Sequence, residues 1–176
     1  TAYQFQGRYF QLWDVLGVDR EMNFSISTNK YNSLDDNHFI LEDIDRDIDF
    51  GEGTSQIYAH GDNYQILNKD GEYSRLVVNE YGRGKGVYFA GLPYSPQNCR
   101  ILLRAIYYAA GMESEMKKFY VTNVDTEVTV FEKTGKIAVI NNSKEAKHSD
   151  LYINGEMACS LDLEPMEMRW IDYNII

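Results

Sequence analysis

Three aspartates at alternate positions open an acidic stretch, and such spacing can hold a calcium ion. Asp45, Asp47 and Asp49 imitate the first positions of a calcium-binding loop, where alternate carboxylates converge on one ion. The rest of the pattern fails, because Phe50 stands where the sharp turn needs glycine and Gln56 stands where a bidentate glutamate should close the loop. We therefore predict a solvated acidic loop and no metal site.

A catalytic nucleophile needs a base beside it, and the chain offers few candidates for such a pair. The pool consists of Cys99, scattered serines and the histidines His38, His60 and His148. No serine stands in a Gly–x–Ser–x–Gly elbow, and Cys99 falls inside an expected helix, where it reads as a small packing residue. None of the 27 acidic residues forms a pair that spacing singles out for glycoside chemistry. No catalytic residue is predicted.

Two further motifs are better explained by structure than by chemistry. Gly82, Gly84 and Gly86 precede an expected strand, whereas a phosphate-binding glycine loop follows a strand and opens a helix, so they predict a turn. Asn23–Ser25 and Asn141–Ser143 match the glycosylation triplet. That triplet matters only in a secreted eukaryotic protein, and nothing else in the sequence supports such a setting.

The best candidates for ligand contact follow a strand that ends at Gly91. Tyr94, Ser95 and Asn98 come at its carboxyl end, where ligands often bind in α/β sheets. The structural interpretation, in which these are loop and capping residues, is favoured, since Ser95 is a good helix cap and Pro96 suits the first helical position. We carry the three as candidate substrate-binding residues with both interpretations open.

The pattern of apolar residues predicts an α/β layer followed by a small all-β antiparallel domain. The first part contains an expected helix, a short apolar run that is either a strand or a helical turn, four short strands and a second helix, at 8–18, 38–41, 56–58, 64–67, 74–79, 86–90 and 95–111. Five short strands follow, with a hairpin turn at Asn154–Gly155. The domains are placed at 1–120 and 125–176.

Composition excludes several classes of partner. The 176 residues carry a net charge of −10, which disfavours nucleic acid and an anionic membrane surface. No apolar run is long enough to span a bilayer, and no signal peptide opens the chain. The two cysteines stand in no metal or redox spacing, so a cytoplasmic location is expected.

Several long segments resemble the lacto-N-biose and galacto-N-biose phosphorylases, which act on galactosyl-N-acetylhexosamines. The matching segments are Gly7–Asp19, Phe24–Tyr31, Asn79–Ser95, Asn98–Gly111 and Glu164–Trp170. The run from Asn79 to Gly111 is the most specific, because so many residues in one order rarely coincide by chance. The likeness spans nearly the whole chain.

The resemblance implies a three-part enzyme: a (β/α)8 barrel, an amidotransferase-like, flavodoxin-like α/β domain and a small β-domain. Such enzymes cleave β-1,3-linked galactosyl-N-acetylhexosamines with inorganic phosphate, invert the anomeric centre and release α-galactose 1-phosphate; a relative acts on galactosyl-rhamnose. The resemblance implies no cofactor beyond phosphate as co-substrate. It places the proton donor and the phosphate-binding arginines in the barrel, so no catalytic residue is carried over to this chain.

By the same resemblance, residues 1–120 would be the rear of the middle domain and 125–176 the terminal β-domain. The middle domain lacks glutaminase chemistry, which agrees with the absence of a thiol at Leu92–Tyr94. The implied partners are the barrel of the same polypeptide and a second copy in a homodimer. The alternative is a free-standing carbohydrate-binding or interaction module, suggested by the 14 Tyr and 2 Trp residues.

Overall fold

The fold is described from a computed structural model that covers residues 9–21, 34, 37–44 and 47–173. Contacts between residues divide the chain into two compact units, Thr1–Gly111 and Met112–Ile176. Among the described residues, no helix has both the length and the apolar character that crossing a membrane requires.

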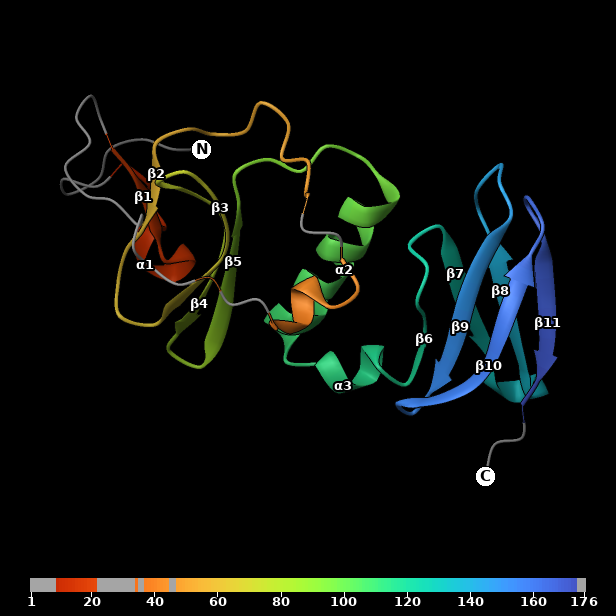
Figure 1. Ribbon diagram of the computed structural model, residues 1–176. Helices are drawn as coiled ribbons and strands as arrows, with labels where there is room; N and C mark the ends of the chain where they lie inside the picture. The colour runs from red at the N-terminus through yellow and green to blue at the C-terminus, as the bar shows by residue number, and fades with distance from the viewer. Residues whose placement is uncertain (1–8, 22–33, 35–36, 45–46, 174–176) are drawn as a thin grey trace. The chain divides into compact units, whose positions relative to one another are not determined.

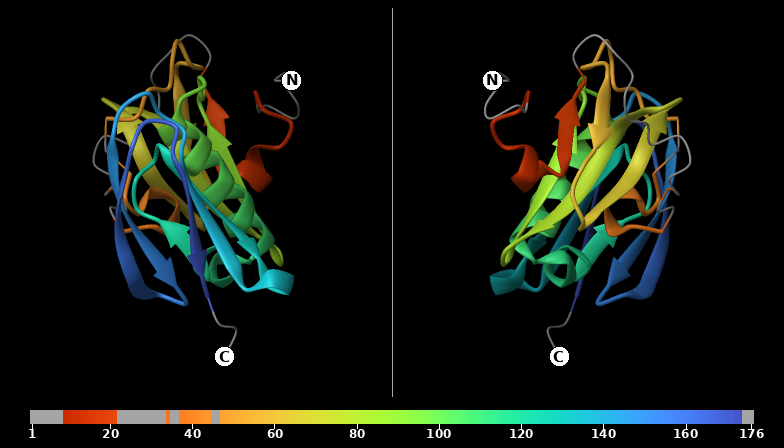
Figure 2. Two further views of the ribbon diagram at one scale, coloured as in Figure 1. Left: turned by 90° about the vertical axis from the view of Figure 1, so that its right-hand side faces the viewer. Right: turned by 90° about the vertical axis from the view of Figure 1, so that its left-hand side faces the viewer.

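A three-stranded antiparallel meander forms the centre of the first unit (Figure 1). Its strands β3 (Tyr64–Asp70), β4 (Tyr73–Tyr81) and β5 (Gly84–Phe89) follow one another in both sequence and space. One face packs against the long helix α2 (Pro96–Ala110) and the short 3₁₀ helix η1 (Phe39–Leu41). The right-hand view of Figure 2 looks at the other face, which carries α1 (Trp13–Leu16), β1 (Val18–Arg20) and β2 (Ile57–Ala59).

Strict alternation along β4 produces the two cores of this unit. Leu76 and Val78 point into the core shared with Ile101 of α2, while Val77 between them points into the core shared with Val18 and the β1–β2 pair. Successive side chains of a strand face opposite sides of a sheet, so a segment buried on both faces, such as residues 76–78, is apolar at successive positions.

The flavodoxin-like α/β layer implied by the resemblance is not confirmed by the described residues, which form small antiparallel sheets. β1–β2 and β3–β4–β5 are all antiparallel pairings, and the described parallel contact is a single bridge between Leu34 and Ile66. In the meander the direction follows from the short connections, because strands joined by two-residue turns, as β3, β4 and β5 are, can only run antiparallel.

The helix expected at 8–18 is also shorter than predicted. Within residues 9–18 only Trp13–Leu16 is helical, and Gly17 ends it in the left-handed conformation with φ of 67°. Asp19 Oδ1 accepts hydrogen bonds from the main-chain nitrogens of Tyr9 and Phe10, both at 3.0 Å, and so fixes those residues outside a helix. These hydrogen bonds from Asp19 cannot be predicted from the spacing of apolar residues in the helix.

The second unit is a sandwich of two three-stranded antiparallel sheets (Figure 1). The strand orders are β10–β9–β6 and β11–β8–β7. The bounds of its elements are α3 (Glu113–Met116), β6 (Phe119–Val121), β7 (Thr126–Phe131), η2 (Glu132–Thr134), β8 (Lys136–Asn141), β9 (Lys147–Ile153), β10 (Glu156–Leu163) and β11 (Met168–Asp172).

The predicted antiparallel β-character of this unit is confirmed, and the turn at Asn154–Gly155 joins β9 to β10. Both turn residues have positive φ, 52° and 83°, as the tight hairpin turn requires. The core between the sheets consists of Val121, Ile137, Val139, Leu151, Leu161 and Leu163. The short strand β6, which pairs with β9, has no counterpart in the sequence prediction.

In the first unit, Gly86 of the meander lies against the backbone of α1. A methyl group added at Gly86 would lie 2.2 Å from the carbonyl oxygen of Val15, and this backbone atom cannot rotate away as the end of a side chain could. We therefore expect Gly86→Ala to lower the free energy of unfolding by about 3 kcal/mol, measured by chemical denaturation. Gly84→Ala is the matched control, since its nearest neighbour would be 3.7 Å away, and it should change stability by less than about 0.5 kcal/mol. Equal effects of the two substitutions would contradict this account of the α1 contact.

Candidate functional site

The three candidate residues Tyr94, Ser95 and Asn98 lie where β5 passes into α2. Ser95 caps the helix, because its Oγ accepts a hydrogen bond from the main-chain nitrogen of Asn98 at 3.0 Å. Asn98 is 2% exposed, whereas Tyr94 is 90% exposed. The structure therefore brings Ser95 and Asn98 together and leaves the Tyr94 side chain in solvent.

Asn98 is held by the backbone of two separate loops. Its Nδ2 donates to the carbonyl oxygens of Asp49 at 2.9 Å and Pro93 at 2.7 Å. A side-chain amide has two N–H groups, so both of its donors are used. The bonds join the loop before β2 to the loop after β5, which gives Asn98 a structural role and supports the capping interpretation of this segment.

Two of the other groups that could take part in catalysis, His38 and His60, make structural contacts. His38 Nδ1 accepts from the main-chain nitrogen of Ile40 and caps η1, and the His60 ring lies 5.1 Å from that of Trp13. Cys99 is exposed on the surface of α2 and Cys159 is half-buried on β10.

The acidic stretch shows loop geometry in its described part. Asp49 Oδ1 accepts from the main-chain nitrogen of Gly51 at 2.7 Å, which uses this oxygen within a turn. Asp47 is exposed, and Asp45 lies outside the described residues. Within residues 9–21, 34, 37–44 and 47–173, no group of three or more His, Cys, Asp or Glu residues is placed to hold a metal ion.

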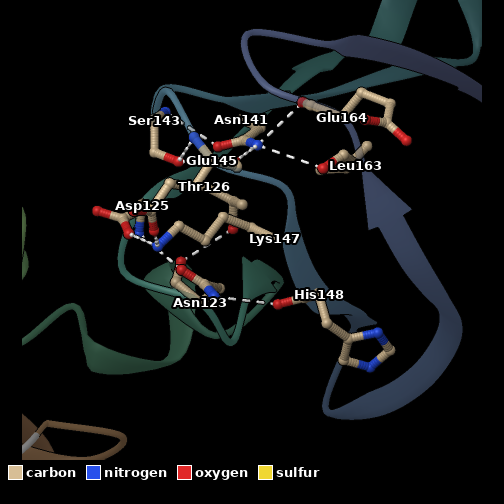
Figure 3. A network of polar contacts seen from close by, with 10 residues as sticks. All are labelled: Asn123, Asp125, Thr126, Asn141, Ser143, Glu145, Lys147, His148, Leu163 and Glu164. Atoms are coloured by element: carbon tan, nitrogen blue, oxygen red, sulfur yellow. Dashed lines mark hydrogen bonds and ion pairs between the residues drawn. The ribbon is translucent and has the colours of Figure 1, made fainter.

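A buried asparagine also organises the second unit (Figure 3). Asn141 Nδ2 donates to the carbonyl oxygens of Glu145 at 2.8 Å and Glu164 at 2.9 Å, with Leu163 at 3.3 Å, and its Oδ1 accepts from the main-chain nitrogen of Ser143 at 2.9 Å. Its side chain is fully buried, so the triplet at 141–143 offers no accessible amide to a glycosylating enzyme. The other triplet, at Asn23, lies outside the described residues.

Beside Asn141, the network in Figure 3 continues through Asn123 and Lys147. Asn123 Nδ2 donates to the carbonyl oxygen of His148 at 3.1 Å, and Lys147 Nζ lies 2.9 Å from Asp125 Oδ2. The Asn123 bond ends on the backbone, and the Lys147 bond joins two opposite charges. The network ties the loops at one end of the sandwich together, and sequence reasoning missed it because the partners are distant along the chain.

The second cluster that sequence reasoning missed is centred on His148, on the outer face of β9. His148 Nδ1 lies 2.8 Å from Asp162 Oδ1 on β10, and its Nε2 lies 3.5 Å from Asp150 Oδ1. The hydrogen bond to Asp162 is the main cause that raises the pKa of His148 above its usual value, with the charges of Asp162 and Asp150 adding to it. Ser160 Oγ donates to Asp150 and not to His148, so the serine is not paired with a base as a nucleophile would be.

Comparisons with known proteins decide the family. Residues 1–115 match the family described as "Lacto-N-biose phosphorylase central domain". Residues 119–171 match the family described as "Lacto-N-biose phosphorylase C-terminal domain". The chain belongs to the lacto-N-biose phosphorylase family. The resemblance carried by Asn79–Gly111 and the neighbouring segments is thereby confirmed.

Curated relatives in the family are similar along almost all of this chain. Two 1,3-beta-galactosyl-N-acetylhexosamine phosphorylases of Lachnoclostridium phytofermentans are 44% and 37% identical over 173 residues, which is 98% of this chain and 24% of each relative. The 1,3-beta-galactosyl-N-acetylhexosamine phosphorylase of Bifidobacterium longum is 32% identical over 202 aligned residues, 97% of this chain and 27% of the relative. The chain thus spans about a quarter of the length of the phosphorylases it matches.

Within the family's central domain, Asn98 provides a test of the structural interpretation. Asn98→Ala removes both donors and leaves the carbonyls of Asp49 and Pro93 without a partner, so we expect a loss of about 2–3 kcal/mol in unfolding free energy. Asn98→Asp should cost more, because a carboxylate would face two carbonyl oxygens. Ser95→Ala should cost about 1 kcal/mol as a lost cap. Denaturant titration measures all three, and an Asn98→Ala protein as stable as the original would contradict the structural role.

Within the C-terminal domain, His148 makes a pH-dependent contribution to stability. Because its folded pKa is raised, the contribution is fully present below the pKa of the unfolded chain, about 6.5, and is lost as the pH rises through the folded pKa. Melting temperatures on either side of this window should therefore show extra stability at the acid end. His148→Gln should abolish that difference, and Asp162→Asn should lower the pKa of His148 in an NMR titration. An unchanged titration in Asp162→Asn would contradict the assigned cause.

Proposed function

We propose that this chain is the non-catalytic C-terminal portion of an inverting phosphorylase in the cytoplasm. The whole enzyme cleaves β-1,3-galactosyl-N-acetylhexosamines with inorganic phosphate, its co-substrate, and yields α-galactose 1-phosphate. One observation carries the proposal: relatives named 1,3-beta-galactosyl-N-acetylhexosamine phosphorylase match 98% of this chain, yet the match is 24% of their length. A fourth relative is named D-galactosyl-beta-1->4-L-rhamnose phosphorylase and is 31% identical over 150 residues, so the galactosyl part is the common element of these names.

In this proposal the two units support the catalytic barrel and contribute to a homodimer. The support comes from α2, whose surface opposite the sheet is also apolar: Leu102, Leu103 and Ile106 are all exposed. A helix that is apolar on both sides is typical of one buried on both sides. We assign the barrel of the same polypeptide as the surface that covers this side of α2.

The finer fold assignment also belongs to this proposal. We propose that the meander is the rear of an amidotransferase-like α/β domain whose parallel strands come from polypeptide outside the chain. The parallel bridge between Leu34 and Ile66 supports this, because it lies on the edge of β3 that no described strand of the meander occupies. A free-standing carbohydrate-binding module remains the second candidate, and it is favoured by the half-exposed Trp170 on the C-terminal domain.

The proposal is tested by comparing this chain with the full-length polypeptide that contains it. Each is incubated with galactosyl-β-1,3-N-acetylglucosamine and phosphate, and galactose 1-phosphate is measured enzymatically. The full-length protein should release it and the 176-residue chain should not. Release by the short chain would overturn the non-catalytic role, and no release by the full-length protein would overturn the assigned activity. Omitting phosphate is the control that separates phosphorolysis from hydrolysis.

A further inference from the structure

The outer face of the sheet β11–β8–β7 carries a large aromatic surface. Along β11 the residues Met168, Trp170 and Asp172 are exposed, and Arg169 and Ile171 between them are only half exposed. Trp170 is 50% exposed. A single exposed apolar side chain is common on protein surfaces, so Trp170 becomes informative through the second exposed ring beside it.

Trp170 is paired with a second exposed ring. The rings of Trp170 and Phe131 lie 5.3 Å apart, centre to centre, and are tilted by 46°, so two adjacent rings from the two edge strands face solvent. The central strand contributes Ala138, the cross-strand partner of Trp170, which is 2% exposed and too small to separate the rings. We call Trp170, Phe131 and the neighbouring Lys136 and Asp172 the Trp170 platform.

A fixed pair of opposite charges adjoins the two rings. Lys136 Nζ lies 2.6 Å from Asp172 Oδ1, and the register places Lys136 beside both Asp172 and Phe131. Asp172 is two residues from Trp170 on the same strand face, about 7 Å along the strand. An ion pair this exposed adds little to stability, so stability does not account for its position.

We propose that the Trp170 platform binds a terminal β-galactosyl residue of an oligosaccharide. This rests on the proposed function for the choice of galactose, the part that the names of the relatives share. A pyranose with an axial 4-hydroxyl has one face of C–H groups that can lie on an aromatic ring. Its hydroxyls can donate to the Asp172 carboxylate and accept from the Lys136 ammonium at the same time.

Charge distinguishes a sugar from other ligands for this surface. The Lys136–Asp172 pair is neutral as a unit and already formed, so an uncharged ligand loses little in ordering it. A polyanion would meet a chain of net charge −10. The platform therefore fits a neutral polyhydroxy compound.

The test follows the indole N–H signal of Trp170 in proton–nitrogen NMR spectra of the 176-residue chain. The chain has 2 Trp residues, and Trp170→Phe assigns the two signals. Galactosyl-β-1,3-N-acetylglucosamine should shift the Trp170 signal saturably with a Kd on the order of 1 mM, whereas glucose, with an equatorial 4-hydroxyl, should bind at least about tenfold more weakly. Asp172→Asn should weaken galactoside binding about tenfold.

Matched variants keep this test decisive. Tyr81→Ala removes a half-exposed ring from the other unit and should leave binding unchanged, while Trp170→Ala should abolish the saturable shifts of the remaining sheet signals. Backbone spectra show whether each variant is folded, and Trp170→Phe keeps a ring if the alanine variant is not.

Three outcomes would overturn the proposal. One is the absence of a saturable shift, and another is equal binding of glucose and galactoside. The third is a shift that depends on protein concentration without sugar, which would identify the face as a contact between two copies. Phosphorolysis by the full-length protein is measured separately, so failure of sugar binding and failure of the proposed activity remain distinguishable.

Discussion

Side-chain amides that satisfy buried main-chain carbonyls hold this protein together at three places. Asn79, Asn98 and Asn141 are all buried, and each directs its Nδ2 at carbonyl oxygens of segments distant in sequence. A buried carbonyl without a partner costs about 1–3 kcal/mol, and loops between short strands expose many such groups. One asparagine that serves two carbonyls therefore fixes two loop segments in one position.

The effect is clearest at Asn79 on β4. Its Nδ2 donates to the carbonyl oxygens of Asp14 at 2.8 Å and Val15 at 3.1 Å, which are carbonyls at the end of α1. Its cross-strand partner Gly86 has no side chain, and this leaves room for the same turn of helix. The amide and the missing side chain thus specify one docking position for α1, and the core around Val18 follows from it.

Local signals in the sequence predicted the elements well and the tertiary contacts poorly. Ser95, Pro96 and Gly111 gave the ends of α2, and Asn154–Gly155 gave the hairpin, because caps and tight turns are determined by a few adjacent residues. The flavodoxin-like layer implied by the resemblance is not confirmed, because two-residue turns join the strands of the meander and such turns require antiparallel pairing. At the candidate site, the sequence found Ser95 as a cap. It offered no means of seeing that Asn98 bonds to Asp49, because that contact spans 49 residues.

Inward-facing and outward-facing positions of the strands differ in what they require, and this difference directs attention to the outer faces of the C-terminal domain. Inward positions such as Ile137 and Leu151 are required by the core, so a change there costs stability whatever else it does. Outward positions carry no such requirement. An exposed aromatic ring such as Trp170 forgoes the burial that would stabilise it, by about 25 cal/mol per Å² of apolar surface left in water. A polar residue would suit this exposed position of the fold equally well. The aromatic side chain is therefore better explained by a ligand that covers it.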